Sequence, residues 1–112
     1  MKPLKVIETT PGKFSLLLNA GETPVDETIS ELGHEPNGYF WEGVATLLVD
    51  KNAPELAEGF SYDPEAGMFC AYGTDKGALE KLGTLMSPVA NDPNQMRKLI
   101  EQAKADGFEF DD

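Results

Sequence analysis

The chain is poor in the residues from which enclosed catalytic and metal sites are most often built. It has one cysteine, one histidine and one tryptophan among 112 residues. A single cysteine, Cys70, cannot form an intrachain disulfide or a thiolate metal cluster, which indicates a reducing compartment, the cytoplasm. The one histidine, His34, would need metal ligands from elsewhere that the sequence does not suggest. We therefore expect no metal and no cofactor.

Positive charge is also scarce, with nine lysines and arginines against 20 acidic residues and a formal net charge of −11. Binding to duplex DNA, RNA or an anionic membrane requires clustered lysine and arginine, so these partners are not expected. Long hydrophobic runs are missing too, and we expect no signal peptide and no membrane span.

Residues that could perform catalysis are not arranged for it. A nucleophilic triad needs a base beside its nucleophile, and His34 lies in an expected loop. Asp63, Glu65 and Glu42 are the best carboxylates for acid and base work, but a working pair needs an apolar pocket and turn carboxylates are solvated. We expect no catalytic residue, and Cys70 is expected to be a small buried hydrophobe.

The acidic residues that are present are concentrated in one window. Residues 20–70 hold 11 of the 20 acids and only one base, Lys51. No fold requires repulsion of this size, so it favours a role in association with a positively charged partner.

Turn signals and periodicity predict an α+β fold, an antiparallel sheet built from two hairpins with helices packed on one face. Pro11-Gly12 separates the first pair of strands, and Asp63-Pro64-Glu65-Ala66-Gly67 separates the second. The expected strands are 4–10, 13–19, 60–62 and 68–73, and the expected helices are 26–32, 38–50, 75–87 and 93–106. The length predicts a single domain, residues 1–112.

Helix signals are clearest at three sites. Asn37 can cap the helix that follows it, whose polar positions Glu42, Thr46 and Asp50 form one narrow line, so this helix should be central and mostly buried. Thr74 is expected to cap the next helix, which Pro88 ends or kinks. Asp92-Pro93 opens the last one.

Three consecutive aromatic residues, Tyr39, Phe40 and Trp41, cannot all point into one face of a helix. Either Phe40 and Trp41 are core residues and Tyr39 is half exposed, or Tyr39 or Trp41 anchors a protein interface.

Three blocks resemble the bacterial immunity protein 51 family: G-H-E-P-N-G-Y-F-W-E-G-V-A (33–45), F-S-Y-D-P-E-A-G-M-F-C-A-Y-G (60–73) and D-G-F-E-F-D-D (106–112). The resemblance implies a small cytoplasmic α+β protein that protects its producer by binding a polymorphic toxin and does not catalyse a reaction. It supplies no catalytic residues.

The leading hypothesis is therefore a toxin-neutralising protein whose acidic surface faces a basic toxin cleft. The alternatives are an acidic regulator or inhibitor of a host enzyme such as a ribonuclease, and a small carboxylate enzyme. The sequence does not indicate the oligomeric state. The expected partner-binding residues are Asp26, Glu27, Glu31, Glu35, Tyr39, Trp41, Glu42, Asp63 and Glu65.

Overall fold

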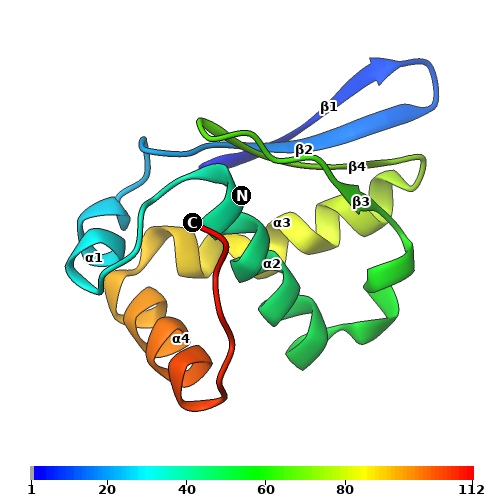
Figure 1. The fold of residues 1–112 in the computed structure, drawn as a ribbon. Coiled ribbons are helices and arrows are strands. Elements are labelled where there is room, and N and C mark those ends of the chain that lie inside the picture. The colour runs from blue at the N-terminus through cyan, green and yellow to red at the C-terminus, as the bar shows by residue number, and fades with distance from the viewer. Residues whose placement is uncertain (1) are drawn as a thin grey trace.

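The computed structural model describes residues 2–112, which form a four-stranded antiparallel sheet with helices on one face (Figure 1). This is the α+β architecture predicted from the sequence. The strands are β1 (Leu4–Thr10), β2 (Lys13–Asn19), β3 (Ser61–Tyr62) and β4 (Met68–Gly73), in the spatial order β1-β2-β4-β3. The helices are α1 (Asp26–Glu31), α2 (Gly38–Asn52), η1 (Pro54–Glu58, a 3-10 helix), α3 (Lys76–Asn91) and α4 (Pro93–Ala105).

The two hairpins form where the turn signals place them. At the first turn Gly12 has a φ of +80°, a conformation that glycine adopts without strain. The second hairpin is shorter than expected, since β3 begins at Ser61 and not at Phe60. Phe60 precedes the strand, and its side chain is in the core. The sheet joins the two hairpins through β2 and β4, so Leu17 lies opposite Cys70.

Helix α2 is the central helix, as its pattern predicts. Its buried residues include Phe40, Trp41, Val44 and Ala45, all with no exposed surface, and they pack between the sheet and α3. The Asn37 side chain caps the helix by accepting a hydrogen bond from the Phe40 N–H at 2.9 Å.

Two details of the remaining helices differ from expectation. Asp75, and not Thr74, caps α3 by accepting from the Ala78 N–H at 3.1 Å, because its carboxylate sits three residues before that donor. Pro88 does not end α3, which continues to Asn91. The exposed position of Pro88 leaves space for its ring on the solvent side of the helix.

Candidate functional site

The expected partner-binding residues separate into three groups in the structure. Asp26, Glu27 and Glu31 lie on α1 at one end of the molecule. A second group gathers around the first turns of α2. It consists of Glu35, Tyr39 and Glu42. A third group, Asp63 and Glu65, lies in the turn between β3 and β4, opposite Cys70 and Met68 on the face of the sheet turned away from the helices. The last residue, Trp41, is in the core.

The start of α2 is joined tightly to the turn between β3 and β4. The Gly38 N–H donates to the Ala66 carbonyl at 3.1 Å. A Cβ atom at Gly38 would overlap the carbonyl oxygens of Glu65 and Met68, so only glycine fits between helix and turn. This contact fixes the backbone of the turn between β3 and β4 against the first turn of α2, although more than twenty residues separate them in sequence.

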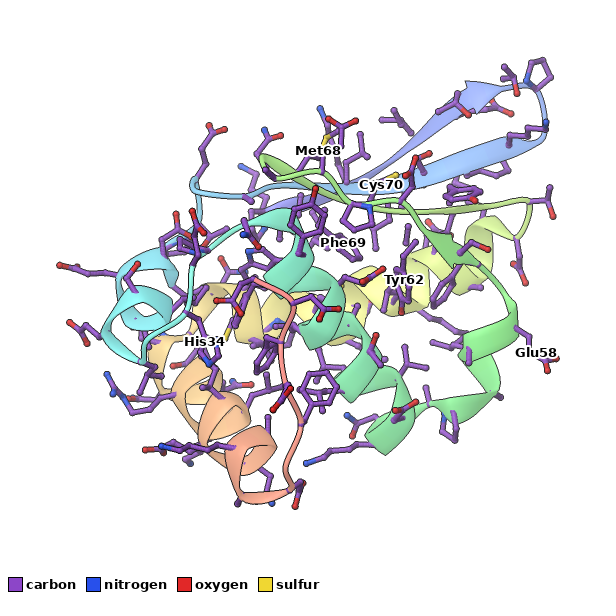
Figure 2. All side chains as sticks on the ribbon, in the orientation of Figure 1. His34, Glu58, Tyr62, Met68, Phe69 and Cys70 are labelled. Carbon is purple, nitrogen blue, oxygen red and sulfur yellow. The ribbon has the colours of Figure 1, made fainter. Side chains whose placement is uncertain are left out.

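A segment far along the chain completes this region. Residues 108–112, here called the tail segment, run back along α2 toward its first turn (Figure 1). The Phe110 ring stacks on Phe40 with 4.7 Å between ring centroids, and it packs so closely on Gly43 that a Cβ there would lie 2.5 Å from the ring. The Asp112 carboxylate accepts a 2.8 Å hydrogen bond from the Glu35 N–H and lies 3.1 Å from Nδ1 of His34 (Figure 2 labels His34).

These contacts settle the charge state of Asp112. Burial of its carboxylate raises the pKa, but the hydrogen bonds from the Glu35 N–H and from His34 outweigh burial and hold the pKa below its ordinary value. The tail segment is therefore anchored by an ionised carboxylate at neutral pH.

The result is an acidic region, the α2 surface, made of Glu35, Tyr39, Glu42 and Asp111. Its members are charged except for Tyr39, whose side chain is 39% exposed. Glu42 has a raised pKa, first because it is partly buried and second because the negative charge of Asp111 lies nearby. The α2 surface therefore holds negative charge that repels itself within the free protein.

Tyr62 borders the same surface from strand β3. Burial raises the pKa of its hydroxyl to about 12, and the charges of Glu42 and Asp50 add to the increase while a hydrogen bond with Thr46 opposes it. The hydroxyl therefore stays protonated at neutral pH and can donate a hydrogen bond beside the exposed line of α2.

The α1 group is less available to a partner. Asp26 accepts hydrogen bonds from the backbone N–H and the hydroxyl of Thr23, which precedes the helix. Glu31 pairs with Arg97 on α4 at 3.4 Å. Of these three acids only Glu27 is both exposed and without a hydrogen bond among the described residues 2–112.

The exposure of the three aromatic residues excludes Trp41 as an interface anchor and leaves Tyr39 as a candidate. Phe40 and Trp41 have no exposed surface, whereas Tyr39 is exposed. Trp41 is therefore a core residue, and its expected place among the partner-binding residues is corrected because no part of its ring reaches the surface.

Cys70 also departs from expectation. It shares one face of β4 with Met68 and Tyr72, as strand alternation predicts, but this is the face turned away from the helices (Figure 2). The thiol is only partly buried. Burial nevertheless raises its pKa, with the charges of Asp63 and Glu65 adding to the rise against a hydrogen bond with Ser15, so at neutral pH it is a weakly nucleophilic thiol.

Sequence patterns missed Asp111, Asp112 and Tyr62. The only signal for the first two was the alternation of aromatic and acidic residues at 108–112. Within residues 2–112 no group of three or more histidine, cysteine or carboxylate side chains is placed to hold a metal ion. No helix in that range is both long and apolar enough to cross a membrane.

An α+β domain whose charged residues form an open surface has the properties of a protein that acts by binding another macromolecule. The model of the family described as immunity protein 51 matches residues 4–105, and the chain belongs to that family. The family gives the chain an immunity function, implies a toxin as its partner and indicates a non-catalytic role. Comparisons with curated proteins and with solved structures gave no match.

Proposed function

We propose that the chain neutralises a cognate bacterial toxin domain of a polymorphic toxin system by placing its α2 surface against a basic active-site cleft. The observation that supports this proposal most strongly is the convergence of acids from two segments far apart in the sequence on the first turns of α2. Glu35 and Glu42 lie at the start of the helix, and Asp111 comes from the tail segment.

The electrostatics favour a cationic partner. Because Glu42 and Asp111 repel each other in the free protein, a lysine or arginine placed between them relieves that repulsion on binding. The net charge of −11 also attracts a basic partner from a distance, and such steering raises association rates by about 10- to 10³-fold at low salt.

The site of action is the producer's cytoplasm, and residues 1–112 act as one domain without a cofactor or catalysis. The acidic regulator of a host enzyme has the same electrostatics, but membership of an immunity protein family favours the toxin. A gene for a toxin directly upstream of this one is expected under the toxin hypothesis and not under the regulator hypothesis.

Two single substitutions of glutamate by glutamine test the α2 surface itself. Glu42→Gln should weaken binding to the cognate toxin domain by about tenfold, since one charge at the centre of the contact is lost. Glu80→Gln is the matched control, because Glu80 is an exposed acid on α3, outside the α2 surface, and the same charge is removed. If Glu42→Gln binds the toxin domain as tightly as the wild type does, the proposed surface is wrong. If Glu42→Gln and Glu80→Gln lose the same affinity, the effect comes from net charge and not from the α2 surface.

A further inference from the structure

The face of the sheet turned away from the helices is covered by no segment of residues 2–112 (Figure 1). Its two central strands present Leu17, Met68, Cys70 and Tyr72 on this side (Figure 2 shows Met68 and Cys70). An antiparallel sheet that faces water normally alternates polar residues outward. Here Ile7 on β1 and Tyr72 on β4 are exposed by 38% and 46%, so the outer face exposes large apolar side chains among its polar ones, which include Lys5, Lys13, Ser15 and Asn19.

The charges on the outer face have an ordered arrangement. Lys5 pairs with Leu17, Leu17 pairs with Cys70, and the Asp63 N–H bonds to the Cys70 carbonyl at 2.9 Å. Directly opposed residues of an antiparallel sheet point to the same face. One row of side chains therefore crosses the sheet with a positive end, an apolar middle and a negative end.

The neighbouring row of side chains contains a protruding residue with a hollow beside it. It runs through Ile7, Ser15, Tyr72 and Ser61. Beside the protruding Tyr72 lies a hollow of about 380 Å³, lined in part by Ser15, Cys70 and Lys13.

We propose that the outer face is the interface between two copies of this chain, related by a two-fold axis parallel to the strands. Rotation about such an axis exchanges the two edges of the sheet, so Lys5 of each copy faces Asp63 of the other and the apolar middles stack. The same rotation places each Tyr72 over the other copy's Ser15, beside the hollow. A two-fold interface must be complementary to itself, and these two rows meet that condition.

The distribution of charge also favours a second copy as the partner that covers the outer face. Two chains of −11 repel if their helical sides meet, but packing by the outer face turns both α2 surfaces outward. The outer face carries Lys5 and Lys13 against Asp63 and Glu65, so its charges balance. A basic toxin cleft is therefore complementary to the α2 surface and not to this face.

The interface is small. Strands β1 and β2 have seven residues each, β4 has six and β3 has two. At about 4.8 Å between strands and about 3.3 Å per residue, the flat area is about 350 Å². A standard interface buries about 800 Å² per partner, so the dimer should be weak and should dissociate on dilution.

Sedimentation velocity of the chain alone, from about 5 to about 500 µM, tests the proposal. We expect the wild type to shift from monomer to dimer across this range, and Lys5→Glu and Asp63→Lys each to weaken the dimer at least tenfold. The double variant Lys5→Glu with Asp63→Lys should restore it. Lys98→Glu, which changes the charge equally on exposed α4, is the matched control and should dimerise more strongly than Lys5→Glu.

Circular dichroism establishes that each variant is folded before its mass is interpreted. A wild type that stays monomeric at the highest concentration overturns the proposal, as does a folded double variant that remains monomeric. Tyr72→Glu supplies an independent check, because it should abolish dimerisation and leave binding to the toxin domain intact. If the wild type never dimerises and Tyr72→Glu abolishes toxin binding, the outer face binds the toxin and not a second copy. The proposal is then wrong, while the immunity function stands.

Discussion

Replacing Gly38 by alanine tests the contact that joins the start of α2 to the turn between β3 and β4. Gly38 is the first residue of α2, and its Cα faces the turn between β3 and β4. An added Cβ would overlap the carbonyl oxygens of Glu65 and Met68. These are backbone atoms that cannot rotate aside, so helix and turn must separate.

The expected cost is the difference between two opposing effects. Alanine in place of glycine favours a helix by at most about 1 kcal/mol, and by less at a first position. Forcing an extra carbon into a packed contact costs about 1–3 kcal/mol. We therefore expect Gly38→Ala to lower the free energy of unfolding by about 2 kcal/mol, which corresponds to a decrease in Tm of about 8 °C in a domain of this size.

Urea denaturation followed by circular dichroism measures this change, and Gly77→Ala is the control. Gly77 is the second residue of α3, and a Cβ there would meet only the Asp75 Oδ1, at an ordinary 3.4 Å. That variant should be as stable as wild type or more stable by up to about 1 kcal/mol. The reasoning fails if Gly38→Ala is no less stable than Gly77→Ala.

Three further predictions concern titratable groups. Glu42→Gln should raise the free energy of unfolding at pH 7, measured by urea denaturation, by no more than about 0.5 kcal/mol, although it weakens toxin binding. The reason is that the pKa of Glu42 is raised in the folded protein, so its ionised form opposes folding. Lower stability at pH 7 would contradict that assignment. Asp112→Asn should cost about 1 kcal/mol at pH 7. Because folding lowers the pKa of Asp112, its contribution to stability is present above the ordinary carboxyl pKa and disappears as the pH falls through the pKa of the folded protein. The Tm values of variant and wild type should therefore converge in acid. A Tm difference that stays constant with pH would refute the anchoring carboxylate. Cys70 should react with a disulfide reagent more slowly at pH 7 than a free thiol does and accelerate above pH 9, and a rate equal to that of a free thiol would show that the raised pKa is wrong.

Local signals were sufficient to predict most of the fold. Pro11-Gly12 and the turn after Asp63 specify both hairpins, and the side chains of Asn37 and Asp92 cap the helices that follow them. These features depend on residues close in sequence. The signal at Pro88 was ambiguous, because a proline within a helix can end it or kink it, and here α3 continues past Pro88 to Asn91.

The candidate site was predicted less completely because it depends on contacts between distant residues. Asp112 and His34 meet across 78 positions, so no local pattern indicates that the tail segment lies beside α2. Counting charge by window assigned the acidity to residues 20–70 and left Asp111 out, although it lies beside Glu42. Strand alternation grouped Cys70 with Tyr72 correctly but could not show which face the helices cover.

The most direct measurement is the rate of association between this chain and its cognate toxin domain as a function of salt concentration. We predict that the rate falls by at least about tenfold between low salt and 0.5 M NaCl, where screening is nearly complete, and that Glu42→Gln has a shallower dependence than Glu80→Gln. A rate that does not depend on salt, with Glu42→Gln and Glu80→Gln indistinguishable, would contradict recognition through the α2 surface.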